Sequence, residues 1–115
     1  MALSGQLKRI AGPAALAAAA ADIYAPPAAT IYTVIRQIRV TNKVAVSATF
    51  NLFVGATGGS AAGTEIAFTT PVAAGASVDI FFSPGLKMLS TDFLTGLASA
   101  VASLTITVMG EQVVV

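Results

Sequence analysis

The chain has 115 residues, a formal net charge of +1, 56% hydrophobic residues and only 10% charged residues. This length predicts a single folding unit with a real core, and so low a charge means that repulsion between molecules contributes little to solubility. The composition favours a subunit packed against others over a free domain. The chain has no cysteine and no histidine, which excludes disulfide frameworks, thiol nucleophiles, Cys-based zinc sites and Ser-His-Asp triads.

The first 29 residues predict an N-terminal arm. A short strand is expected over residues 6–10, ended by Gly12-Pro13. Residues 14–21 are alanine apart from Leu16, and eight residues are too few for a stable isolated helix. We therefore expect a partly extended arm, with a docked helix as the alternative.

Neither a secretion signal nor a membrane span is expected. Residues 14–21 are too weakly apolar for the hydrophobic region of a signal peptide. The long uncharged stretches 44–64 and 93–110 are interrupted by polar residues and glycines. The membrane is therefore not an expected partner.

Residues 31–54 carry the clearest pattern. A β-branched strand over residues 30–42 leads through Asn42-Lys43 into residues 46–54, where apolar side chains occupy alternate positions. Phe53 breaks the pattern because it falls on the polar side of that strand. Arg36 would share a face with Val34 and Ile38, and would be buried unless a bulge shifts the phase or Arg36 lies at the end of the sheet.

Shorter strands follow. A glycine-rich loop over residues 55–63 leads to a strand over 65–69, closed by Pro71; later strands are expected over 77–83, 93–97 and 103–113, with Pro84-Gly85 breaking the chain before a short strand or bend at 86–89. Seven to eight strands with regular turns predict an all-β fold, an antiparallel β-sandwich of jelly-roll or Ig-like type. The expected division is an arm over residues 1–29 and a sandwich over 30–115.

Catalytic chemistry is not expected. The carboxylates fall at separate turns or strands, without the spacing of a catalytic pair: Asp22, Glu65, Asp79, Asp92 and Glu111. The glycine-rich loop lacks the Gly-Lys-Ser/Thr of a phosphate cradle, and no Asp-x-Asp pattern suggests a calcium site. The chain is therefore interpreted as a protein without enzymatic activity, cofactor or metal.

Five cations lie in the first 43 residues, which raises the question of nucleic-acid binding. Few aromatic residues are interleaved with them, so few rings are available for nucleic-acid bases to stack on. We interpret them instead as charges that keep strand edges from pairing with other chains, or that meet acids on a partner protein, and expect no nucleic-acid partner. These cations are Lys8, Arg9, Arg36, Arg39 and Lys43.

Large apolar side chains on the expected outer faces form the candidate interface. Burying each one against a partner is worth about 1.5–3 kcal/mol. The alternative is that the strand phase is wrong at some positions, or that the arm covers them. The candidates are Phe53, Phe81 and Met109, joined by Tyr24 and Tyr32.

Several hairpin and turn sequences resemble those of small structural proteins of tailed bacteriophages. They are IRQIRVTN at 35–42, ATFNLFV at 48–54, VAAGASVD at 72–79, LSTDFL at 89–94 and VMGE at 108–111. The resemblance spans about residues 30–113, and the chain departs from it in the alanine-rich 14–21 and in the longer loop at 58–63.

The resemblance implies an antiparallel β-sandwich of the virion, most often a capsid decoration (cement) protein that stabilises the lattice. It implies the major capsid protein or another virion protein as partner, and a symmetric homo-oligomer, with a trimer expected first. A tail, baseplate or fibre component of the same fold is the alternative. A carbohydrate-binding module is a second alternative, which the absence of tryptophan and the presence of only two tyrosines disfavour.

Overall fold

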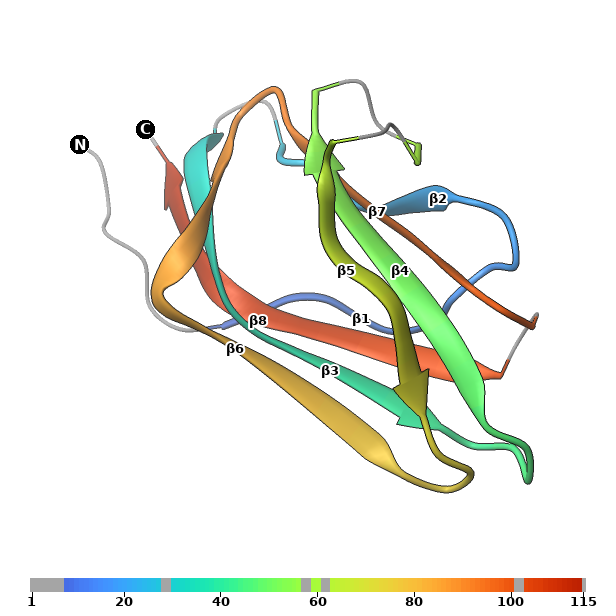
Figure 1. The fold of residues 1–115 in the computed structure, drawn as a ribbon. Coiled ribbons are helices and arrows are strands. Elements are labelled where there is room, and N and C mark those ends of the chain that lie inside the picture. The colour runs from blue at the N-terminus through green and yellow to red at the C-terminus, as the bar shows by residue number, and fades with distance from the viewer. Residues whose placement is uncertain (1–7, 28–29, 57–58, 61–62, 101–102, 115) are drawn as a thin grey trace.

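The computed structural model describes residues 8–27, 30–56, 59–60, 63–100 and 103–114. These fold into eight β-strands in two four-stranded sheets (Figure 1). The strands are β1 (Lys8–Ala15), β2 (Ala21–Tyr24), β3 (Thr30–Asn42), β4 (Ala48–Gly55), β5 (Glu65–Val72), β6 (Ser77–Leu89), β7 (Phe93–Ala98) and β8 (Leu104–Val114). No helix among these residues is long and apolar enough to cross a membrane.

The strands pair as in one long hairpin that is folded over to form two sheets. Sheet A has the order β1-β8-β3-β6 and sheet B the order β2-β7-β4-β5. All six pairings are antiparallel. Four of them join first to last strand, second to seventh, third to sixth and fourth to fifth, and the other two join β3 to β8 and β4 to β7. Eight strands paired in this way form a jelly roll. The predicted antiparallel β-sandwich is confirmed, and of its two expected topologies the chain has the jelly roll.

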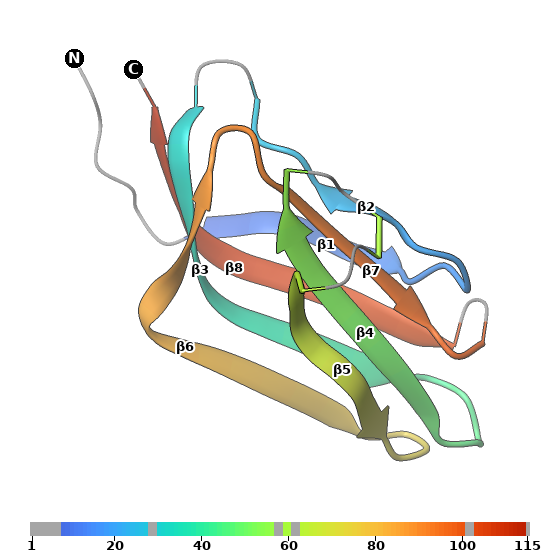
Figure 2. The ribbon, with the colours of Figure 1, turned by 45° about the horizontal axis from the view of Figure 1, so that its top comes forward.

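The core lies between the two sheets, which pack face to face (Figure 2). The alternation predicted for β4 is confirmed, because Ala48, Phe50 and Leu52 are all buried. The strand begins at Ala48, however, two residues later than expected. Val46 therefore lies in the preceding turn and is 70% exposed, so its predicted inward position is wrong.

The N-terminal segment does not form a separate arm within the described residues. β1 pairs with β8 at one edge of sheet A, and β2 pairs with β7 at one edge of sheet B. Leu16, between the two strands, is buried in the core, and its backbone N–H donates to the Leu104 carbonyl at 2.9 Å. Residues 14–21 contain no helix, as preferred from the sequence. Residues 6–7 of the predicted first strand lie outside the described residues.

Two predicted chain breaks are interruptions inside continuous strands. β1 passes through Gly12-Pro13 with a register shift, and β6 passes through Pro84-Gly85. In β6, Phe81 pairs with Gln37 and Leu86 with Ile35, so residues 82–85 form an excursion between them. The separate segment predicted at 86–89 is thus the second half of β6. β5 likewise continues past Pro71 to Val72, which an edge strand permits.

Arg36 lies in a β-bulge, which was one of the two explanations considered for its place among apolar residues on β3. Both ladders of β3 shift register between Ile35 and Gln37. The bulge lets Ile35 and Ile38, three residues apart, both point into the core with no exposed surface. Arg36 is left partly exposed and paired with an acid on β8.

Candidate functional site

The outer face of sheet A gathers three of the five candidate interface residues. Gln37 on β3 is the register partner of both Phe81 on β6 and Met109 on β8, and Met109 is the partner of Arg9 on β1. Opposite residues of antiparallel strands share a face, so these four side chains form one row across the sheet. Phe81, at its end, is 71% exposed, and Met109 is partly buried.

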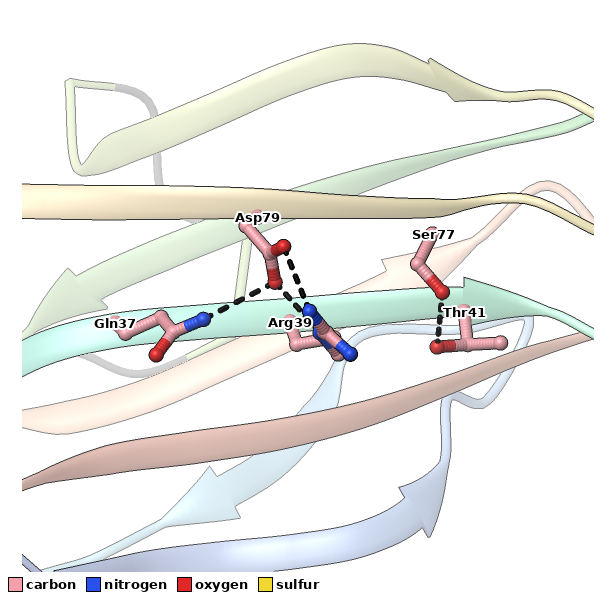
Figure 3. A network of polar contacts seen from close by, with 5 residues as sticks. All are labelled: Gln37, Arg39, Thr41, Ser77 and Asp79. Carbon is pink, nitrogen blue, oxygen red and sulfur yellow. Dashed lines mark hydrogen bonds and ion pairs between the residues drawn. The ribbon is translucent and has the colours of Figure 1, made fainter.

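The neighbouring rows are polar and internally neutralised (Figure 3). Arg39 donates from Nε and Nη2 to the two oxygens of Asp79, at 2.7 and 2.9 Å, and Gln37 donates to the same carboxylate at 3.1 Å. The hydroxyls of Thr41 and Ser77 are hydrogen-bonded at 2.8 Å. The hydrogen bond from Arg39 lowers the pKa of Asp79, opposed by partial desolvation and assisted by Gln37; the same hydrogen bond raises the pKa of Arg39.

A shallow depression lies at the other end of this face. It has a volume of about 250 Å³ and is lined by Val34, Arg36, Pro84, Gly85 and Lys87. Arg36 Nε donates to Glu111 Oε2 at 2.9 Å, so its charge is matched. Its lining combines the apolar Val34 and Pro84 with the cationic Arg36 and Lys87.

Tyr32, the third candidate on this face, lies beside the depression. The Lys87 ammonium lies 4.6 Å from the centroid of the Tyr32 ring, in cation–π range. Tyr32 is partly buried, so its ring keeps some accessible surface.

Phe53 is on the outer face of sheet B, as the alternation predicts, but it is covered by its own chain. Only 4% of it is exposed. Its register partner Thr95 is also buried, and the Thr95 hydroxyl donates to the Gly59 carbonyl in the loop between β4 and β5. The expectation that Phe53 is accessible is wrong, because Phe53 is buried where the chain at Gly59 comes against its register partner.

Tyr24 points into the sandwich rather than outward. It is buried, and its hydroxyl is hydrogen-bonded to Thr33 Oγ1 at 3.0 Å and accepts a hydrogen bond from Gln112 Nε2. Because Tyr24 belongs to sheet B and its two partners to sheet A, the contact ties the two sheets together. Its predicted outward position is wrong, since the polar end of the ring finds its partners inside.

Phe68 is an exposed aromatic residue that the sequence pattern missed. The predicted strand at 65–69 places Ile66 and Phe68 on one face. In the structure Ala67 lies opposite the buried Leu52, and Phe68 points away from the core with 67% exposure. The register of β5 with β4 shifts on both sides of Ala67, and the shift between Ala67 and Thr70 includes Thr69, which has a φ of 48° and whose N–H donates to the Asn51 side chain. No residue type in this strand signals that bulge.

Among the described residues, no three His, Cys, Asp or Glu side chains come together in a group that could hold a metal ion. Two of the carboxylates, Asp79 and Glu111, are bound by arginines on the neighbouring strand β3. What the outer face of sheet A offers is thus a broad surface for contact: the exposed Phe81 and the partly buried Tyr32 and Met109, set among neutralised ion pairs and hydroxyls.

No protein-family model and no curated protein sequence matches the chain. A solved structure of Bacillus endospore appendages, described as a novel family of disulfide-linked pili, has a similar fold. It is 20% identical in sequence, with a TM-score of 0.55 over 96% of this chain and 88% of that chain. At this identity the similarity concerns the β-sandwich fold alone.

Proposed function

We propose that this protein is a structural subunit of a tailed-phage virion, a capsid decoration protein that binds the capsid lattice without catalysing a reaction. The observation that carries the proposal is that Tyr32, Phe81 and Met109 share the outer face of sheet A, with Phe81 and Met109 in one row and Tyr32 nearer the other end. The phage-like hairpin and turn sequences support the choice of particle.

The electrostatics of the face suit docking on a large surface. The ion pairs Arg39–Asp79 and Arg36–Glu111 are closed within the subunit, so they need no partner of opposite charge. Large apolar side chains are left beside them, and each gains free energy when it is removed from water. Many such weak contacts on a repeating lattice add up through multivalency. A homo-oligomer, which the resemblance implies as a trimer, multiplies them further.

The test uses capsids of the phage that encodes this chain, prepared without the protein. Purified protein is added, and co-sedimentation and the thermal stability of the capsid are measured. Decoration predicts saturable binding at a fixed copy number and a capsid that melts at a higher temperature. Met109→Glu, which places a charge within the face, should weaken binding; Leu97→Glu, on the outer face of sheet B, is the matched control and should not. Absence of binding to capsids contradicts the proposal.

A fibre or tail component is the second candidate, and the similarity in fold to a pilus subunit favours it. The pili are described as disulfide-linked, whereas this chain has no cysteine. A fibre built from this chain would therefore need contacts other than disulfides between its residues. Electron cryo-microscopy of the virion separates the two candidates, since density at the tail alone favours the fibre and density on the capsid favours decoration.

A further inference from the structure

The two sheets have four edge strands, and three of them are poor templates for pairing with another chain. β1 contains Gly12-Pro13 and two register shifts, and β2 has only four residues. β5 carries the Thr69 bulge, Pro71 and two register shifts. Short length, proline and bulges are the usual devices that protect an edge from pairing.

The first half of β6 lacks these devices. From Ser77 to Phe81 its register with β3 is unbroken, and the described residues pair it with β3 only. The one charge in this segment, Asp79, is neutralised by Arg39. A regular edge with free backbone groups and no unmatched charge is a template for another strand.

The side chains of this segment are also incompletely covered. Val78, Ile80 and Phe82 pack against the core but are only partly buried, in contrast to the fully buried Ile38 and Val40 on the neighbouring strand. Phe81, on the opposite face, is 71% exposed. A strand added at this edge would cover apolar surface on both faces at once.

We propose that the occupant of this edge is a second copy of the chain, whose β6 pairs antiparallel with the first across a two-fold axis at Ile80. The segment between Ala76 and Pro84, residues 77–83, is centred on that residue. A two-fold axis perpendicular to the sheet pairs outer-face residues with outer-face residues, so the axis must pass through a residue that faces itself.

The two neighbouring registers of this strand pairing, with the axis at Asp79 or at Phe81, are less favourable. An axis at Asp79 places two carboxylates directly opposite each other, which is destabilising. An axis at Phe81 sets Val78 opposite Pro84, which has no N–H to donate. With the axis at Ile80, Phe81 lies opposite Asp79 of the second copy, beside the guanidinium of Arg39 that binds this carboxylate. An aromatic ring next to guanidinium is a favourable cation–π arrangement.

The pairing joins two A sheets into one eight-stranded sheet with both outer faces on the same side. It predicts an even number of subunits: a dimer, or a hexamer where a threefold contact exists as well. The contact does not depend on any phage particle, so it is tested on the purified protein alone.

Sedimentation equilibrium on wild type, Phe81→Glu and Phe68→Glu tests the edge. Both phenylalanines are exposed on edge strands, but Phe68 lies on the outer face of sheet B, which makes it a matched control. Phe81→Glu sets two carboxylates opposite Asp79 residues and should raise the dissociation constant at least about tenfold. Phe68→Glu should leave it unchanged, and Phe81→Lys, which faces Asp79 with an opposite charge, should weaken association less than Phe81→Glu.

A cross-link tests the register. Because the chain has no cysteine, Ile80→Cys introduces a single thiol that would lie next to its own copy, and mild oxidation should give a covalent dimer. Phe68→Cys should not cross-link. A monomeric wild type, an odd-numbered oligomer insensitive to Phe81→Glu, or equal cross-linking of the two cysteine variants would overturn the proposal.

Discussion

The carboxylate of Asp79 receives two hydrogen bonds from Arg39 and one from Gln37 on the exposed side of sheet A. An isolated ion pair on a protein surface contributes little to stability. This one has the paired geometry of guanidinium and carboxylate, which fixes both side chains. Its main effect is on the surface, because it pairs the charge of Arg39 with that of Asp79 beside the row that contains Phe81 and Met109.

The lowered pKa of Asp79 makes a prediction for stability against pH. A carboxyl group with a lower pKa in the folded than in the unfolded state stabilises the fold above its unfolded pKa of about 4. That contribution is lost as the pH falls through the folded value. In urea unfolding followed between pH 7 and pH 2, Asp79→Asn should therefore differ from wild type near neutrality and converge with it in acid.

Arg39→Met provides the second leg of this experiment. It removes the hydrogen bond that is the largest cause of the pKa shift, so it should abolish the same pH-dependent part of the stability. The double variant should add nothing further. An Asp79→Asn protein that keeps the full pH dependence of wild type would show that other carboxyl groups are responsible.

At the same scale, Phe53 shows how far a local pattern reaches. Alternation along β4 correctly places its side chain on the outside of the sheet. Whether a side chain on that face is exposed to water depends on the chain at Gly59, which contacts Thr95. The glycine-rich sequence there carries no pattern that predicts this contact. Phe81 lies on an edge strand with no such loop paired to it among the described residues, and it is exposed.

At the scale of the strand, bulges decide which side chains face the core. The bulge at Arg36 was predictable because Val34, Arg36 and Ile38 cannot share a buried face without burying a cation. The bulge at Thr69 was not, because Ile66 and Phe68 alternate without conflict. It depends on a contact with Asn51 on the neighbouring strand, which periodicity along one strand does not contain.

Gly110 allows β8 to pass close to β3 at the Arg36 bulge. A Cβ at this position would lie 2.2 Å from the Val34 carbonyl oxygen, a backbone atom. Gly110→Ala must therefore shift one of the two strands, and we expect it to lower the free energy of unfolding by about 1–3 kcal/mol. Guanidinium unfolding measures this.

The control is Gly75→Asn in the turn between β5 and β6. Gly75 has a φ of 70°, and an added Cβ would meet nothing within 4 Å. Asparagine tolerates this backbone conformation better than other side chains, so stability should change little. If Gly110→Ala lowered the free energy of unfolding no more than Gly75→Asn does, the close approach at Gly110 would be relieved at no cost in stability.

At the scale of the whole molecule, the N-terminal segment closes both sheets at the same side of the sandwich. The all-β class and the number of strands were predictable, because each strand and turn has a local signature. The place of β1 beside β8 was not, because Lys8 pairs with Gly110 across almost the whole sequence. Residues rich in alanine carry no alternation, so the segment resembled an arm.

Leu16 tests whether this segment packs on its own chain. The side chain is buried in the core between β1 and β2. Leu16→Ala should lower the free energy of unfolding by about 2–5 kcal/mol, by the same amount at low and high protein concentration. Val46→Ala, at an exposed site, should have little effect. A loss that depends on protein concentration would instead show that the segment packs on a neighbouring subunit.

The position of β8 between β1 and β3 has a consequence for biosynthesis. Sheet A cannot close until residues 104–114 have left the ribosome, because this last strand is the partner of the first and of the third. Pairings between such distant residues form slowly. A chain that ends before β8 therefore lacks the complete row from Arg9 to Phe81, and does not present the surface by which we expect the protein to enter an assembly.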